Sequence, residues 1–370
     1  MDPHQRIMKA LNHEEPDRVP TFSQSIEEPF IERFDENVGV DEALFDELFP
    51  SLPVDFVFAK ALGFDSKWMH LGGLQAPPGD HPDVSNVPEG CTVNNSGRFY
   101  KRNSRGENWY QDGALKTPEL LKDWISYIKT FTTRDESYFR SFASMWEFGI
   151  NHGILPIPTI GGPTYMTWSS IGIGKFGYML RKHRKLVKEL ITAWTTKTIE
   201  AHSLLFEQNV DMVFICDDFA QKDRLMMHPS DFNEVVIPNY NRMVKNAHDH
   251  GAKFIVHSDG DLSEAFPGMV DAGVDGAEPL EYEAGMRLKD LKLRFGEDIC
   301  LIGNVPASSA LCVGTAEYTR DITKQCIKDA AAGGGFILSA GANILATTKI
   351  ENVQVMIETT KKYGQYPIQL

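Results

Sequence analysis

Three short apolar runs, each ending in polar residues, stand close together in this chain: DMVFICDDFAQ at residues 211–221, KFIVHSDGDL at 253–262 and GVDGAEPLE at 273–281. Helical sequence separates the three runs. Strands that alternate with helices at this spacing indicate βα units and a parallel sheet. In such sheets the functional residues lie at the carboxyl ends of the strands. The sequence therefore predicts one polar site where these three strands end.

The same alternation of strand and helix extends over most of the 370 residues. Further strands are predicted at TFSQ (21–24), ILPIPTIG (154–161), ICLIGNV (299–305) and GFILSAG (335–341). A count of about eight such units indicates an α/β fold, a (β/α)8 TIM barrel that forms a single domain over residues 1–370. Residues 66–115 differ, because clustered glycines and prolines separate short runs typical of antiparallel strands. We predict a β-hairpin or β-meander inserted there.

The composition excludes several classes of protein. The formal net charge of −14 argues against a general nucleic-acid binder, because phosphate binding needs a basic face. No run approaches the ~18 apolar residues of a membrane span, and the N-terminus begins no apolar signal region. The five cysteines are irregularly spaced and include no CxxC pair, which predicts a reducing compartment. We therefore expect a cytoplasmic protein without nucleic-acid or membrane partners.

The most specific candidate site is the His257-x-Asp259 pair, which begins where the predicted strand KFIVH should end. Residues two apart on a strand point to the same side, so both side chains can reach one ligand. A metal site needs converging N, O or S donors, and this pair can supply two of them. The alternative is a structural histidine held by hydrogen bonds.

Acids and a thiol end the two neighbouring strands. Asp217 and Asp218 follow Cys216, and each acid can serve as a metal ligand, a general acid or an anchor for a substrate hydroxyl. Adjacent residues face opposite ways, so one acid is expected in the mouth, while the other caps a helix or pairs with Arg224. Glu278 ends the third strand, where a buried acid needs a metal, a proton or an arginine.

Aromatic residues follow the predicted strand at residues 154–161. The segment GGPTYMTW lacks the glycine patterns of nucleotide sites, but its glycines let a flat ligand approach the backbone. Tyr165 and Trp168 can form an aromatic wall against such a ligand, although core packing also explains Trp168. Gln24, at the end of the first predicted strand, is a further candidate for substrate contact.

Several stretches together resemble the uroporphyrinogen decarboxylase superfamily over nearly the whole chain. They are RIMKALNHEEPDRVP (6–20), ALGFD (61–65), GGPTYMTW (161–168), DDFAQ (217–221), HPSDF (228–232), HSDGD (257–261), GAEPLE (276–281), LIGNVPASSAL (301–311), GGGFILSAGANI (333–344) and ENV (351–353). This superfamily contains decarboxylases of a porphyrin precursor and methyltransferases that work with corrinoid proteins. The resemblance implies a (β/α)8 barrel and a homodimer.

The branches of the superfamily differ at positions visible in this sequence. Decarboxylases carry an arginine-rich segment after the first strand, whereas this chain reads SQSIEEPF at 23–30, with two acids that would repel a polyanion. Methyltransferases that act on thiols bind zinc through a His-x-Cys pair and a later cysteine. Here the pair is His257-x-Asp259, and the later position reads SAGA at 339–342.

The chain therefore resembles the methyltransferase components that demethylate methoxylated aromatics. In that branch the methyl group of a small-molecule donor passes to the cobalt(I) of a corrinoid (cobalamin) carried by a partner protein. A zinc ion or a protonated acid would assist the leaving oxygen. For this mechanism we predict three sets of residues: catalytic residues His257, Asp217 and Asp259, metal ligands His257, Asp259, Glu278 and Cys216, and substrate contacts Tyr165, Trp168, Asp218 and Gln24.

Three alternatives stay open from the sequence. A decarboxylase would need cationic groups in the mouth, for which Arg18 and Arg224 are the obvious candidates. A methylcorrinoid:thiol methyltransferase would need a different zinc site. A corrinoid-binding or regulatory module without chemistry would not need so many polar strand ends.

Overall fold

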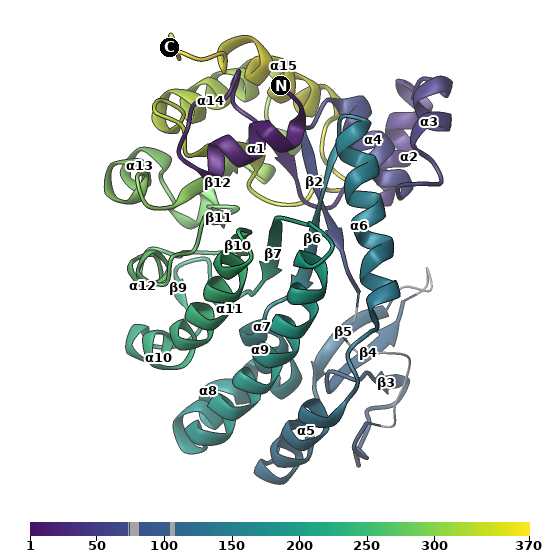
Figure 1. Ribbon diagram of the computed structural model, residues 1–370, viewed down its shortest axis with the longest axis vertical. Coiled ribbons are helices and arrows are strands. Elements are labelled where there is room, and N and C mark those ends of the chain that lie inside the picture. The colour runs from purple at the N-terminus through teal and green to yellow at the C-terminus, as the bar shows by residue number, and fades with distance from the viewer. Residues whose placement is uncertain (73, 75–80, 104–107) are drawn as a thin grey trace.

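The computed structural model describes residues 1–72, 74, 81–103 and 108–370. In this part of the chain eight strands, all paired in parallel, close into a barrel in the order β1-β13-β12-β11-β10-β7-β6-β2 (Figure 1). Their bounds are β1 (Thr21–Ser23), β2 (Ser66–His70), β6 (Leu155–Gly161), β7 (Met212–Cys216), β10 (Lys253–His257), β11 (Gly276–Glu278), β12 (Cys300–Val305) and β13 (Phe336–Ala340). The predicted (β/α)8 barrel is confirmed.

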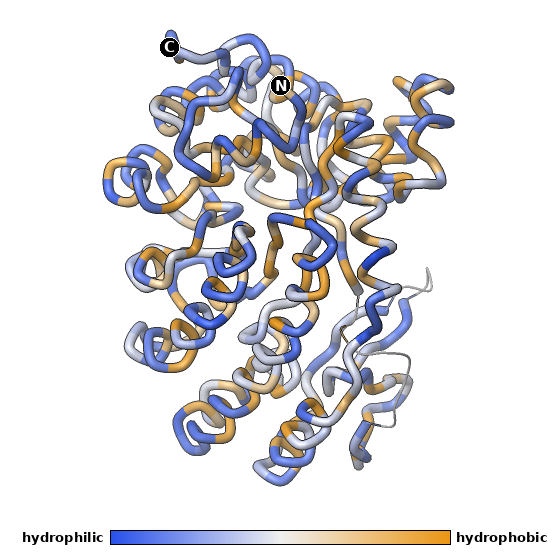
Figure 2. Tube along the Cα trace, in the orientation of Figure 1, coloured by the Kyte–Doolittle hydropathy of each residue, from blue (hydrophilic) through white to orange (hydrophobic). Residues whose placement is uncertain are grey.

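Helices cover the outside of the barrel. They are α1 (Pro3–Leu11), α2 (Glu28–Asn37), α3 (Glu42–Leu48), α4 (Val54–Leu62), α5 (Pro118–Thr130), α6 (Glu136–Asn151), α7 (Pro163–Ile171), α8 (Ile173–Lys182), α9 (Arg184–Phe206), α10 (Pro229–Val235), α11 (Ile237–Asp249), α12 (Phe266–Asp271), α13 (Leu288–Phe295), α14 (Ala316–Ala330) and α15 (Ile350–Tyr363). Figure 2 shows apolar and polar segments alternating along them, as amphipathic helices packed on a core require. Among the described residues no helix combines the length and apolar character needed to cross a bilayer.

The core lies inside the barrel and between the barrel and its helices. Every residue of β12 and β13 is buried, which explains why these strands read as continuous apolar runs. Across the barrel interior Phe22 of β1 stacks on Phe214 of β7, with ring centroids 5.1 Å apart. The interior is therefore filled, and a ligand can enter only at the ends of the strands.

The predicted β-meander is present but begins later than residue 66. Ser66–His70 is barrel strand β2, paired with β1 and β6, so the predicted start of the insertion was wrong. The three-stranded antiparallel sheet contains β3 (Cys91–Val93), β4 (Arg98–Arg102) and β5 (Asn108–Gly113). Residues 73, 75–80 and 104–107 of the predicted insertion lie outside the described residues. The Tyr110 hydroxyl donates to the carbonyl of Ser169 (2.9 Å), which joins the meander to α7.

The amino ends of the strands are closed by an ion-pair network. Asp65, which precedes β2, accepts hydrogen bonds from Arg18 and Arg6, each at 2.7 Å, and from the Thr21 backbone nitrogen at 2.9 Å. Thr21 begins β1, so this network lies at the end of the barrel away from the predicted site. Arg18 therefore does not lie at the end of the barrel where the site was predicted.

A buried histidine between α9 and the barrel is expected to make the stability depend on pH. His202 is 1% exposed, its Nε2 atom has no hydrogen-bond partner in the described part of the chain, and burial lowers its pKa to about 3. The unfolded chain, with an ordinary histidine, binds the extra proton below about pH 6.5. Stability is therefore expected to fall as the pH falls from about 6.5 toward 3.

Urea unfolding at pH 6.8 and pH 5.0 checks this expectation. The unaltered protein should lose about 2 kcal/mol more than the His202→Phe variant between these two pH values, since one pKa unit corresponds to about 1.4 kcal/mol. Equal losses in the two proteins would show that His202 does not titrate in this way.

Candidate active site

A cavity of about 900 Å³ opens at the carboxyl ends of the barrel strands, beneath the meander. Its walls come from strand ends, from the loops that follow them, from α7 and from the meander. The lining includes Gln24, Trp68, His70, Gly161, Tyr165, Met166, Cys216, Asp218, His257, Asp259, Asn343, Asn94, Asn95, Ser96, Arg98, Tyr100 and Arg134. Cavities of this size hold small organic ligands. The structure thus gathers most of the predicted site residues around one space.

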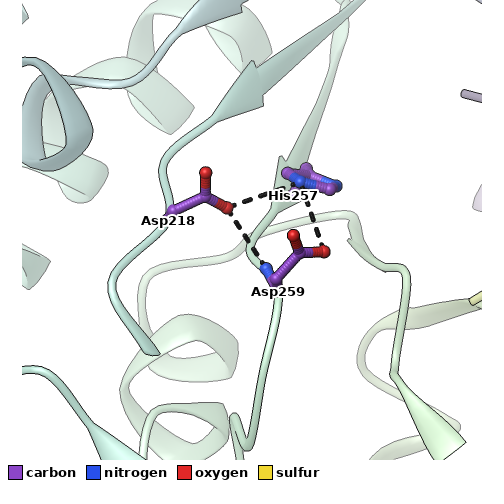
Figure 3. A group of neighbouring side chains, drawn as sticks. All are labelled: Asp218, His257 and Asp259. Carbon is purple, nitrogen blue, oxygen red and sulfur yellow. Dashed lines mark hydrogen bonds and ion pairs between the residues drawn. The ribbon is translucent and has the colours of Figure 1, made fainter. Parts of the chain in front are cut away.

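The chemically active part of the cavity is a cluster of Asp218, His257 and Asp259. Figure 3 shows both carboxyl groups directed toward the imidazole ring. The His257 Nε2 atom lies 3.5 Å from Asp218 Oδ1 and 3.8 Å from Asp259 Oδ1. The Asp259 backbone nitrogen donates to Asp218 Oδ1 at 3.2 Å. The donor atoms of the cluster lie within 4.8 Å of one another, close enough to hold one metal ion.

The barrel itself brings these residues together. Cys216 and His257 are register partners at the ends of adjacent strands β7 and β10. Asp218 and Asp259 each follow two residues later, where the chain leaves the strand. The loops after β7 and β10 therefore begin at the same level of the barrel, and their carboxylates meet beside the imidazole ring.

A second pair of residues fixes the orientation of the imidazole. His257 Nδ1 lies 2.5 Å from Glu278 Oε2, and the Gln24 amide donates to Glu278 Oε1 at 2.7 Å. His257 is 5% exposed and Glu278 is fully buried. With Nδ1 bound to Glu278, Nε2 faces Asp218 and Asp259. A carboxylate behind a histidine in this way is the arrangement found around histidines that bind metals.

The cluster carries an excess of negative charge. Burial disfavours the charged imidazole, yet Glu278, Cys216 and Asp218 outweigh burial and raise the pKa of His257 well above its usual 6.5. Burial also opposes the charge of Asp218, but the hydrogen bond and charge of His257 prevail and lower its pKa. Enclosure by the cavity raises the pKa of Asp259 to about 6, although water reaches its 55% exposed side chain and weakens this shift. A divalent cation would neutralise this cluster.

Asp217 does not lie with the other predicted catalytic residues. Its carboxylate is fully buried, accepts from the Tyr165 backbone nitrogen (2.7 Å) and from the Tyr240 hydroxyl (2.9 Å), and does not line the cavity. Burial raises its pKa to about 6. A side chain at Gly162 would place its Cβ only 2.2 Å from Asp217 Cβ, so this glycine permits the close approach. Asp217 thus joins the start of α7 to the end of β7.

Tyr240 supplies a test of the structural role of Asp217. Tyr240→Phe removes a buried hydrogen bond to the carboxylate and is expected to lower the free energy of unfolding by about 2 kcal/mol. Urea unfolding measures this loss of stability. The variant is expected to bind ligands in the cavity as the unaltered protein does, because Tyr240 does not line the cavity. Unchanged stability would contradict the role given to this pair.

Other predicted residues fall into two groups. Tyr165 and Cys216 line the cavity, and burial raises the pKa of the Cys216 thiol to about 12. Trp168 lies behind Tyr165, with ring centroids 5.4 Å apart, and donates through Nε1 to the Asp218 carbonyl.

Neither Cys216 nor Glu278 belongs to the group of candidate metal-binding atoms, whereas Asp218, predicted as a substrate contact, does.

Several cavity residues were not predicted from the sequence, among them Trp68, Arg98 and Arg134. Trp68 packs edge-on against His257, with ring centroids 5.3 Å apart, but its strand had been assigned to the insertion. Arg98 and Arg134 line the cavity instead of Arg18 and Arg224. Arg224 is exposed and pairs with Asp223 at 3.7 Å. No sequence pattern indicated which face of the meander would meet the barrel.

This chain is similar to proteins of known structure and to a known family. The structure is similar to that of a methyltransferase from Methanosarcina mazei, with 19% identity, a TM-score of 0.68, and coverage of 98% of this chain and 99% of that chain. A sugar phosphate isomerase/epimerase from Parabacteroides distasonis matches with 10% identity, a TM-score of 0.40, and coverage of 94% and 95%. No curated protein matches the sequence. Residues 157–363 match the family model described as uroporphyrinogen decarboxylase (URO-D), more than half of the chain. The chain therefore belongs to the uroporphyrinogen decarboxylase family.

Proposed function

We propose that this protein is a methyltransferase that moves the methyl group of a methoxylated aromatic compound to the cobalt(I) of a corrinoid bound to a separate protein. The observation that carries the proposal is the Asp218–His257–Asp259 cluster in a cavity with aromatic walls. The barrel shared with a methyltransferase, at a TM-score of 0.68, is compatible with it. The corrinoid partner and a homodimer come from the family resemblance, a cytoplasmic location comes from the cysteine pattern, and all three belong to the same proposal.

The reaction has one difficult step. The electron pair of cobalt(I) forms a bond to the methyl carbon while the bond from that carbon to the ether oxygen breaks. The oxygen keeps the bonding pair and leaves as a phenolate, which then takes a proton from the solvent or from an acid. A phenolate is a poor leaving group, so the site must stabilise negative charge on this oxygen as the bond breaks.

The cluster fits a zinc ion. One imidazole nitrogen and two carboxylates would hold it through Asp218, His257 and Asp259, which leaves a position for substrate as in catalytic zinc sites. The fit rests on the Glu278–His257 contact, which directs Nε2 toward the two acids, and on the excess negative charge. When bound there, zinc would act as a Lewis acid on the ether oxygen.

The remaining residues position the substrate. Tyr165 and Trp68 supply aromatic surface in the cavity wall, against which a substrate ring can stack. The Asp259 side chain is half exposed, so a methoxy group bound at the cluster can face a corrinoid docked from the solvent. Gln24 acts through Glu278, because it holds the carboxylate that orients His257.

The alternatives receive less support from the site. Arg98 and Arg134 supply cations that a decarboxylase would need, but Asp218 and Asp259 in the same cavity would repel a porphyrin precursor with several carboxylates of its own. For transfer to a thiol, the family's first cysteine position holds Asp259 and the later position falls in the stretch SAGA at 339–342, so the thiolate ligands of that zinc site are missing.

The deciding experiment combines the purified protein, zinc, a reduced cobalt(I) corrinoid and a panel of methyl donors that includes methoxybenzoates, methanol and methylamines. Aryl methyl ethers are expected to convert the corrinoid absorbance to that of methylcobalamin, with release of one phenol per methyl group. Transfer only from other donors, or release of carbon dioxide without corrinoid, would overturn the proposal.

A further inference from the structure

Arg98 is a buried cation in the wall of the cavity. It begins β4 of the meander and is 7% exposed. Its Nη1 atom donates to the hydroxyls of Tyr100 (3.2 Å) and Tyr165 (3.1 Å), and Nη2 contacts the Met166 sulfur at 2.6 Å. The guanidinium also stands over the Tyr165 ring, 4.8 Å from its centroid. All of these partners are neutral.

No acid within the described residues forms an ion pair with Arg98, and its Nε atom has no hydrogen-bond partner there. A thioether is a weak acceptor, and phenol oxygens do not carry a compensating charge. A buried guanidinium normally has a carboxylate or phosphate partner, because the cost of leaving water is otherwise not offset. The missing partner must therefore come from outside this part of the chain.

The cavity supplies the place for that partner. Arg98 and the Asp218–His257–Asp259 cluster line the same space, which gives it a cationic wall at the meander and an acidic wall at the strand ends. Tyr165 connects the two, because its hydroxyl binds Arg98 and its backbone nitrogen binds Asp217, the neighbour of Asp218. These walls match a ligand whose anionic end faces Arg98 and whose methoxy group faces the Asp218–His257–Asp259 cluster.

We propose that Arg98 binds a carboxylate of the substrate, so that the preferred methyl donors are methoxylated aromatic acids. A guanidinium binds a carboxylate through paired N–H donors, and the hydroxyls of Tyr100 and Tyr165 can donate to the same group. This inference rests on the proposed function for the identity of the reaction, but the binding it describes can be measured without any methyl transfer.

Isothermal titration of the purified protein with 4-methoxybenzoate and 4-methoxybenzamide tests the inference. The two probes have nearly the same shape, and only the first is charged. The unaltered protein is expected to bind the acid at least about tenfold more tightly than the amide, the usual value of a hydrogen bond to a charged group. Arg98→Met should remove this preference while amide binding remains, and Arg98→Lys should keep part of it.

Arg102→Met is the matched control, because Arg102 belongs to the same strand but is exposed and does not line the cavity. It should leave the preference unchanged. Equal affinities of the unaltered protein for both probes, or a preference that survives in Arg98→Met, would overturn the inference. Retained amide binding in Arg98→Met shows that the cavity is intact.

The inference and the proposed function can fail separately. A carboxylate preference without methyl transfer would support the role of Arg98 and reject the proposed function. Efficient methyl transfer from neutral ethers alone would support the proposed function and reject the role of Arg98.

Discussion

Replacing His257 with asparagine is expected to lower the rate of methyl transfer at least about a hundredfold, because removing a group that only orients a metal ligand already costs up to that much. The asparagine amide can occupy the place of Nδ1 and keep the hydrogen bond to Glu278, so the buried carboxylate retains a donor. The variant loses Nε2, the atom that faces Asp218 and Asp259. Methylation of cobalt(I) cobalamin by an aryl methyl ether, followed by absorbance, measures the effect.

Asparagine is preferred to alanine at this position, because alanine would leave Glu278 with Gln24 as its remaining described partner and would destabilise the fold. Far-UV circular dichroism and thermal unfolding show whether the asparagine variant is folded. A folded variant with normal turnover would remove His257 from the mechanism.

Replacing Glu278 with glutamine is expected to weaken zinc binding about tenfold to a hundredfold, the usual effect of removing a carboxylate that orients a histidine ligand. The variant keeps the size of the side chain but loses the charge that makes the imidazole a strong donor. Competition with a chromophoric chelator measures the affinity, and methyl transfer at low zinc concentration should fall in parallel.

Glu283→Gln serves as the control for this measurement. Glu283 lies five residues after Glu278, is exposed and accepts from the Ser309 hydroxyl at 3.1 Å, and the described hydrogen bonds and ion pairs do not join it to His257. Its removal should leave zinc affinity unchanged. Equal affinity of Glu278→Gln and the unaltered protein, or no zinc binding by the unaltered protein, would contradict the metal site.

The barrel could be predicted from sequence because its strands are buried on both faces. Runs such as MVFIC and FILSA are apolar without alternation, and helices separate them at regular intervals. The exception was Ser66–His70, whose sequence SKWMH contains a lysine and a histidine. Lys67 is nevertheless buried, since it pairs with Asp55 at 2.5 Å behind the strand. A buried ion pair gave this strand the composition of a surface hairpin.

The site was predictable where a residue's position on a strand determines its direction. His257 and Glu278 end adjacent strands, so their contact follows from the register of β10 and β11. Alternation also required that Asp217 and Asp218 face opposite ways, but the choice between them depended on Tyr240, 23 residues away in sequence. The role of Trp168 likewise depended on a contact with a distant carbonyl. Such long-range partners leave no local signal.

The meander has a consequence for how enzymes of this shape diversify. The acids and the histidine come from the barrel, whose geometry cannot change without loss of the closed sheet, whereas Arg98 comes from an insertion attached to α7. In the function proposed for this chain, reactivity and substrate choice thus depend on structurally separate parts of the protein. Mutations in the insertion can change which methyl donor is accepted while the reacting centre stays the same. Relatives with different insertions are therefore expected to catalyse the same reaction on different substrates.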